Sequence, residues 1–215
     1  MRTQPQDVIA KLEADNSRLA KEKILLDAMN EGLDEFFEGL KMCLDKLYTF
    51  GVKQVPTKDE VVAGQGCPWN VFKDLAEKLY NRELTGHNAR DAINLVMSSA
   101  TTEQWNGFYR RILIKDLRCG VSEKTVNSVA KKNKFGKYMV PVFTCQLAHD
   151  SANHEKKLVG EKMLEVKLDG VRTLAIVHPD GKVDMLSRNG KEFTNFGHIQ
   201  AVSYTHLTLP TKVEV

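Results

Sequence analysis

The chain has 215 residues, enough for one large domain or two small ones. Hydrophobic residues make up 42% and charged residues 27%, a balance that excludes collagen-like, fully disordered and disulfide-scaffold classes. The formal net charge of +3 is too small to indicate an anionic partner, so local clusters of charge matter more. No apolar run has the length of a membrane span, and residues 1–7 do not resemble a signal peptide. We therefore expect no membrane partner and a cytoplasmic location.

Helical patterns fill the first two thirds of the chain. Apolar residues recur at helical intervals over 8–29 and 33–47, and later over the ranges 71–79, 89–97, 105–113 and 126–130. Thr101 with Gln104 is typical of a capping box, and Ser122 is a candidate cap for the last helix. These patterns predict an all-helical domain over residues 1–145.

The pattern changes near Pro141 and becomes β-like after Lys162. Short strands are expected at residues 163–167, 171–178 and 183–187, with turns at 179–181 and 189–190. Roughly fifty residues of this kind are too few to bury a core of their own. We therefore interpret residues 146–202 as the incomplete start of an antiparallel-β-rich domain. For residues 203–215, which do not extend the sheet pattern, our hypothesis is a sequencing or assembly artefact.

The four cysteines form no C-x-x-C pair and have no zinc-finger spacing to a histidine. We expect them to be reduced and mostly buried thiols. The sequence assigns no metal ligand. The four are Cys43, Cys67, Cys119 and Cys145.

The strongest chemical signal lies in residues 165–172, E-V-K-L-D-G-V-R. Lys167 ends a predicted strand, and Arg172 follows on the next strand after a tight Asp-Gly turn. A lysine must be unprotonated to attack a phosphate, and a nearby guanidinium and a divalent cation would both lower its pKa. The same charges would stabilise the phosphoryl oxygens during transfer. A surface hairpin with these residues by chance is the alternative; we favour the lysine nucleophile.

The pattern K-x-D-G-x-R resembles the nucleotide-binding signature of the covalent nucleotidyltransferases, which are DNA ligases, RNA ligases and mRNA capping enzymes. Residues 187–190, S-R-N-G, are an ordinary polar turn by themselves, but at this distance from Lys167 they are similar to the S-R-x-G element of DNA ligases. Residues 84–86, L-T-G, and 111–122, R-I-L-I-K-D-L-R-C-G-V-S, resemble the helical DNA-binding domain of ATP-dependent DNA ligases, closest to those of tailed bacteriophages. The resemblance covers about residues 7–200.

This resemblance implies an ATP-dependent DNA ligase that seals nicks in double-stranded DNA during replication, repair and recombination. Lys167 would take AMP from ATP with the help of Mg²⁺. Glu165 would lie near the adenine, Arg172 near the ribose or phosphate, and Arg188 near phosphate. The resemblance also implies a monomer in the cytosol of a bacterium or of a phage-infected host. The family's metal-binding carboxylates and its C-terminal OB-fold have no match here, so we expect that this chain alone does not seal nicks.

Basic residues crowd the end of the helical part, where they could neutralise the phosphates of a DNA duplex. Helix N-termini at Thr85 and Ser122 would add backbone donors. A solvated basic face explains the cluster equally well. Two other functions stay open: an RNA ligase or capping guanylyltransferase, and a helical DNA-binding module whose β part is inert. The residues assigned to DNA binding are Arg110, Arg111, Lys115, Arg118 and Lys124.

Overall fold

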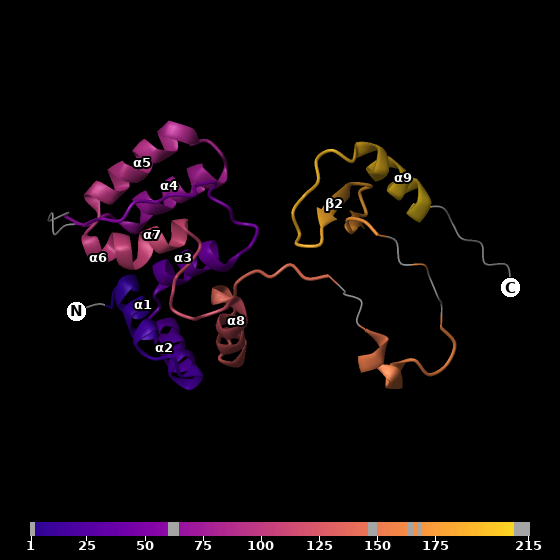
Figure 1. Cartoon of the computed structure of the whole chain (residues 1–215), viewed down its shortest axis with the longest axis horizontal. Coiled ribbons are helices and arrows are strands. Elements are labelled where there is room, and N and C mark those ends of the chain that lie inside the picture. Colours follow the sequence, from indigo (N-terminus) through magenta and orange to yellow (C-terminus); the bar gives the residue numbers. More distant parts are fainter. Residues whose placement is uncertain (1–2, 60–64, 146–149, 163–165, 167–168, 209–215) are drawn as a thin grey trace. The chain divides into compact units, whose positions relative to one another are not determined.

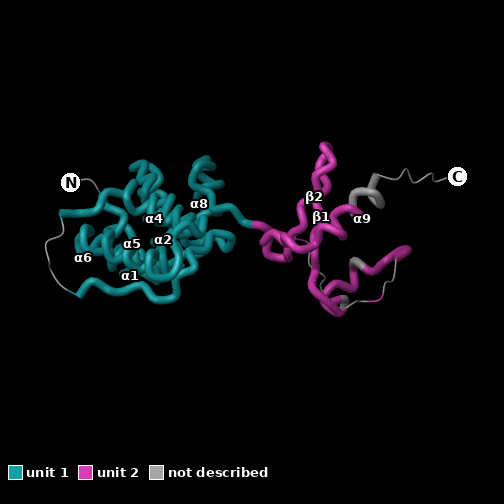
Figure 2. The backbone as a smooth tube through the Cα atoms, turned by 90° about the horizontal axis from the view of Figure 1, so that it is seen from above, with its two compact units in different colours: residues 1–142 teal, residues 143–215 magenta. Residues whose placement is uncertain are grey.

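The computed structural model describes residues 3–59, 65–145, 150–162, 166 and 169–208. The chain divides into a helical unit, Met1–Val142, and a second unit, Phe143–Val215 (Figure 2). The sequence-based boundary lies three residues later, after residue 145. The two units are described separately.

The helical unit contains helices at the positions that the apolar patterns predict (Figure 1). The pattern over 8–29 belongs to two helices rather than one, because the chain turns between them and the Ser17 hydroxyl accepts a hydrogen bond from the Ala20 amide. The Ser17 cap was not predicted from the sequence, whereas both predicted caps are confirmed: Thr101 forms a capping box with Gln104, and Ser122 accepts from the Thr125 amide. The elements are α1 (Pro5–Ala14), α2 (Arg18–Asn30), α3 (Asp34–Leu44), α4 (Trp69–Tyr80), α5 (Gly86–Ser99), α6 (Thr102–Gln104), a π-helical turn (Trp105–Tyr109), α7 (Arg110–Leu113), α8 (Glu123–Lys132) and a 3-10 turn (Gly136–Tyr138).

One apolar core joins these helices, and its centre is aromatic. Phe72 and Tyr109 stack with their ring centroids 4.3 Å apart, and Trp105 is fully buried. Two of these side chains also fasten the long extended segment between α3 and α4. The Trp105 indole donates to the Pro56 carbonyl at 2.9 Å, and the Tyr109 hydroxyl donates to the Cys67 carbonyl at 2.8 Å. The core therefore fixes a non-helical segment that would otherwise have few backbone partners.

The second unit contains an antiparallel hairpin of β1 (Thr173–Val177) and β2 (Val183–Ser187), followed by α9 (Gly197–Thr208). The predicted strand at 183–187 is confirmed, and the one predicted at 171–178 is shorter. Both predicted turns are present, because the Gly181 amide donates to the His178 carbonyl and the Gly190 amide to the Ser187 carbonyl. Two short 3-10 turns, Ser151–Asn153 and Glu155–Lys157, precede the hairpin.

Two expectations fall partly outside the described residues. Of the strand predicted at 163–167, only Val166 is described, and it is not in a strand. The segment interpreted as an artefact, 203–215, is helical up to Thr208, where α9 ends, and residues 209–215 are not described.

Candidate functional site

The lysine motif is described only in part. Lys167 and Glu165, the expected nucleophile and adenine-side residue, lie outside the described residues. Asp169 and Gly170 of the same motif are exposed to solvent. Arg172 is exposed as well and directly precedes β1.

The hairpin brings the two motif arginines to the same end of the second unit. The ladder ends at the pair Thr173–Ser187, so Arg172, just before β1, and Arg188, the first residue of the turn after β2, flank the same end of the hairpin, which we call the arginine edge. Guanidinium groups are well suited to an anionic ligand.

Cys145 contacts both Arg172 and Arg188. The sequence predicted only that this cysteine is a reduced thiol. Its Sγ is 4.0 Å from Arg172 Nη1 and 3.7 Å from the Arg188 carbonyl oxygen. Phe143 packs on the turn after Arg188, where Gly190 has φ +83° and a Cβ would lie only 2.5 Å from Phe143 Cγ. Phe143 and Cys145 therefore both pack against the arginine edge of the hairpin.

In the helical unit, three of the five predicted DNA-binding side chains have internal partners: Arg110, Arg111 and Lys115. The Arg111 guanidinium donates to Glu13 Oε1 at 2.6 Å and to the Leu117 carbonyl at 2.9 Å, and the side chain is only 17% exposed. Lys115 Nζ donates to the carbonyls of Met42, Asp45 and Tyr48 at 2.8, 2.5 and 2.7 Å. Burial lowers the pKa of the Lys115 amine. The geometry of Arg111 and Lys115 therefore supports a structural role, because their donors already have partners.

Arg118 and Lys124 remain accessible, whereas Arg110 is intermediate in exposure. Arg118 is 62% exposed and lies 3.6 Å from an Asp116 carboxylate oxygen, so part of its charge is balanced locally. Lys124 is exposed on the first turn of α8. Arg110 is partly buried, and its Nε donates to the Val55 carbonyl at 3.0 Å.

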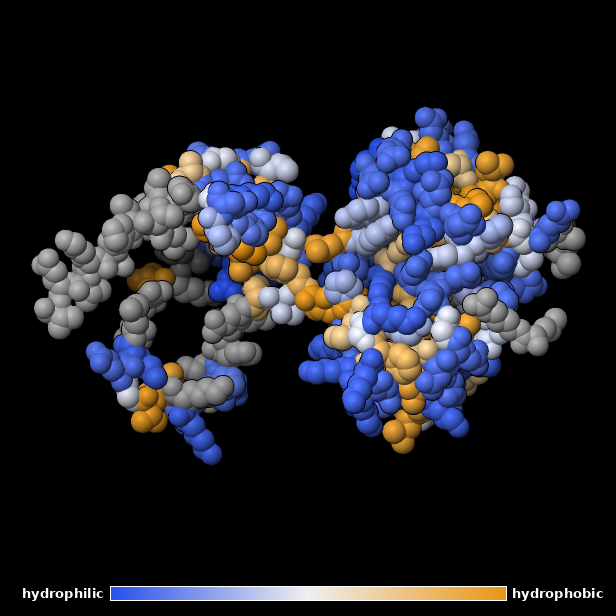
Figure 3. Space-filling view, turned by 180° about the vertical axis from the view of Figure 1, so that it is seen from behind, coloured by the Kyte–Doolittle hydropathy of each residue, from blue (hydrophilic) through white to orange (hydrophobic). Residues whose placement is uncertain are grey.

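Sequence reasoning missed a basic groove on the helical unit, which we define by Lys53, Arg82, Arg90 and Arg110. These cations come from the segment before α4, the turn before α5, α5 itself and α7. The sequence carries no run of charge that joins them, so only the folded chain brings them together. Figure 3 shows one face of the helical unit on the right. This face is mostly polar and has small apolar patches.

A metal site was not predicted, and the described residues do not form one. Within that part of the chain, no group of three or more His, Cys, Asp or Glu side chains is placed to hold a metal ion. Mg²⁺ is implied by the family resemblance alone. None of the described helices is both long and apolar enough to span a membrane.

The chain is similar in sequence and fold to solved structures whose names suggest a ligase. Two such structures, "Pmar-Lig_PreS3" and "Pmar-Lig_Pre.", are each 58% identical to this chain with a TM-score of 0.84. Each match covers 95% of this chain and 46% of the other, so the chain spans less than half the length of these structures. Scans of protein-family models and of curated proteins give no match.

Proposed function

We propose that this chain is the N-terminal part of an ATP-dependent DNA ligase, which joins nicks in duplex DNA during replication, repair and recombination. The observation that carries this proposal is the 58% identity to ligase-named structures over a segment that contains K-x-D-G-x-R and S-R-N-G. Identity at this level, spread over 95% of the chain, concerns both units rather than one motif.

The proposed reaction begins at the Lys167 amine. Its lone pair forms a bond to the α-phosphorus of ATP, the bond from that phosphorus to the bridging oxygen breaks, and pyrophosphate leaves with the electron pair. The amine loses its proton, and AMP remains on nitrogen. AMP then passes to the 5′-phosphate at the nick, and the 3′-hydroxyl displaces it to close the backbone.

The arginine edge of the hairpin supports this assignment. Phosphoryl transfer accumulates negative charge on the phosphate oxygens, and fixed guanidinium groups stabilise that charge without reorganising. Arg172 directly precedes β1 and Arg188 directly follows β2, so both are candidates to supply such a group at this end of the hairpin. Glu165 is assigned to the adenine side by its position in the motif.

DNA rather than RNA or a cap is favoured by the helical unit. Residues 111–122 resemble the DNA-binding domain that precedes the catalytic domain in DNA ligases, whereas capping enzymes and most RNA ligases lack that domain. The basic groove of this unit is a further feature that suits a duplex.

The test uses the complete gene product with ATP or GTP labelled at the α-phosphate, and then a nicked duplex. We expect labelling by ATP, nick sealing, and loss of both in Lys167→Ala with duplex binding retained. Labelling by GTP alone would favour a capping enzyme, and sealing of nicked RNA but not DNA would favour an RNA ligase. Duplex binding without any labelling, unchanged by Lys167→Ala, would favour an inert DNA-binding module.

A further inference from the structure

The basic groove runs along one side of the helical unit between α5 and the extended segment before α4. Two adjoining hollows of about 450 and 660 Å³ share Lys53, Gln54 and Arg90 in their walls, so they form one continuous groove. Arg82 belongs to the first hollow and Arg110 to the second. In Figure 1 the extended segment crosses the unit beside α5 and α7.

The charge of this groove is positive and locally unbalanced. The walls of the two hollows contain four cationic side chains and no carboxylate among the described residues. Lys53, Arg82 and Arg90 are exposed, and none of them forms a salt bridge with any residue that the structure describes. Cations held in a hollow without counter-charges raise the local concentration of an anionic partner.

Two backbone features hold these cations at the groove. Gly51 has φ +70°, and a Cβ at this position would lie 1.4 Å from Arg82 Nη1, so the guanidinium packs directly on the glycine backbone. On the other side, the hydrogen bond from Arg110 Nε to the Val55 carbonyl fixes a second guanidinium against the extended segment. The groove is therefore formed by the fold, and its cations are not merely mobile side chains on a convex surface.

Four of the five residues that the sequence assigned to DNA binding already have internal or local partners, whereas the lysines of α8 remain exposed. Arg111 pairs with Glu13 and Arg118 with Asp116, so two of these cations already face carboxylates. Lys115 donates to three backbone carbonyls. Among the residues assigned to DNA from the sequence, Arg110 alone also lines the groove.

We propose that the basic groove binds the sugar–phosphate backbone of double-stranded DNA. This rests on the proposed function, which supplies duplex DNA as the substrate. Spaced cations in an open groove suit a repeating phosphate chain. A single nucleotide is less suited, because the one aromatic residue of the lining, Phe50, is buried at 3% exposure and cannot stack on a base.

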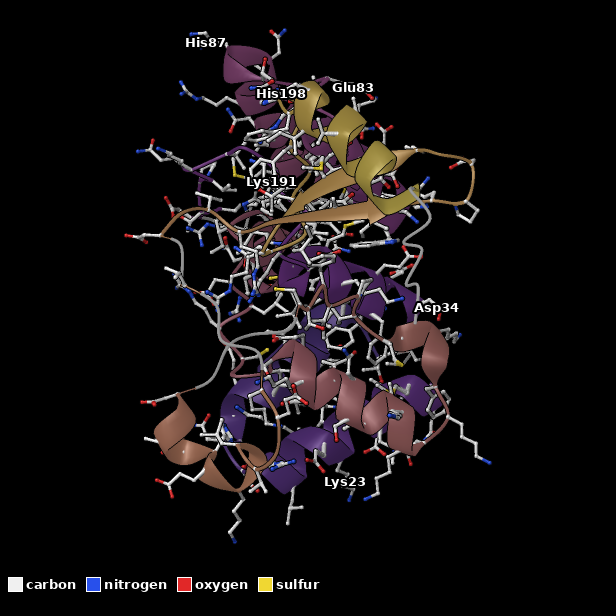
Figure 4. All side chains as sticks on the ribbon, turned by 90° about the vertical axis from the view of Figure 1, so that its right-hand side faces the viewer. Lys23, Asp34, Glu83, His87, Lys191 and His198 are labelled. Atoms are coloured by element: carbon white, nitrogen blue, oxygen red, sulfur yellow. The ribbon has the colours of Figure 1, made fainter. Side chains whose placement is uncertain are left out.

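The test measures binding of the 215-residue chain to a labelled duplex by fluorescence anisotropy, over a series of salt concentrations. Arg82→Gln/Arg90→Gln is compared with Lys11→Gln/Lys23→Gln, which removes two exposed cations elsewhere. In Figure 4, Lys23 lies at the opposite end of the unit from His87, which is on the first turn of α5. Circular dichroism and tryptophan fluorescence check that every variant is folded.

We expect the groove variant to bind about tenfold or more weakly and its salt slope to fall by about 1.8, since each lost phosphate contact contributes about 0.9. The control should lose less than about twofold. Arg82→Lys/Arg90→Lys should recover most of the affinity, because a phosphate contact requires charge rather than the guanidinium shape.

Two results would overturn the inference in distinguishable ways. If Arg118→Gln/Lys124→Gln weakens binding while the groove variant does not, DNA binds at the other basic face and the proposed function stands. If the unmodified chain shows no salt-dependent binding to duplex DNA, the groove assignment fails, and the helical unit no longer supports a DNA ligase. The labelling test at Lys167 is then the remaining evidence for the function.

Discussion

Replacing Lys115 by methionine separates a structural role from a DNA-binding role at this position. Lys115 has φ +60° immediately after α7, and the Asp116 amide donates to the Arg111 carbonyl, as in a Schellman helix end. Methionine keeps the length of the side chain and the left-handed backbone but removes the amine. The change therefore tests only the three hydrogen bonds that Lys115 Nζ donates. Their acceptors are the backbone carbonyls of Met42, Asp45 and Tyr48, in and after the C-terminal part of α3.

The expected loss of stability is about 2–4 kcal/mol. A hydrogen bond to a charged group contributes about 1.5–3 kcal/mol, so three of them set an upper limit of roughly 4.5–9 kcal/mol. Two effects reduce this value. Burial of the amine has its own cost, seen in the lowered pKa of Lys115, and the site is only partly buried, so water can reach the vacated carbonyls.

Urea unfolding followed by tryptophan fluorescence measures this loss. The two tryptophans of the chain, Trp69 and Trp105, both lie in the helical unit, so the signal reports that unit. With a urea dependence of about 2 kcal/mol per molar, the midpoint should fall by about 1–2 M. Lys124→Met, at an exposed site, is the matched control and should shift it by less than about 0.3 M. A drop in DNA affinity without any change in the midpoint would refute the structural reading of Lys115.

Four further outcomes follow from packing and burial. Gly39→Ala should destabilise the helical unit by about 1–3 kcal/mol in the same urea assay, because its Cβ would lie 2.5 Å from Phe108 Cζ; an unchanged midpoint would contradict this packing. Gly190→Ala should raise hydrogen exchange in the β1–β2 hairpin about tenfold by mass spectrometry, because a residue at φ +83° would be strained and would also meet Phe143; equal protection would argue against this contact. In the folded chain at pH 8, iodoacetamide should label Cys145 and spare the buried cysteines until urea is added, and rapid labelling of a second thiol would show that the core opens. Burial raises the pKa of Cys43 from 9.0 to about 12, so the stability linked to this thiol is complete below pH 9 and is lost as the pH rises toward 12; Cys43→Ala should flatten that decline in an alkaline urea series.

The parts of the fold that could be predicted depend on short-range signals. The helices, the caps at Thr101 and Ser122 and both hairpin turns follow from residues a few positions apart. The same local reasoning failed where position in the core decides the outcome. Leu19 fits the apolar pattern of α2, yet it is 77% exposed, because periodicity alone does not show which face a neighbouring helix covers.

The candidate site could be predicted only where its residues are close in the sequence. The spacing of the lysine motif and the S-R-N-G turn indicated Arg172 and Arg188, and the hairpin register then explains why two distant motifs share an edge. The contact between Cys145 and Arg172 joins residues from segments with no common pattern. No local sequence pattern predicts such a contact, because it depends on the tertiary fold of the chain.

The contrast between Lys115 and Arg90 shows why a basic cluster in a sequence is a poor guide to a basic surface. A cation in a dense cluster must be kept apart from its neighbours, and folding achieves this at Lys115 and Arg111 by giving each of them acceptors inside the unit. A solitary cation such as Arg90 is under no such constraint, and it remains exposed in the groove wall. In this chain the groove brings together cations from separate segments, so its positive charge becomes visible only in the folded structure.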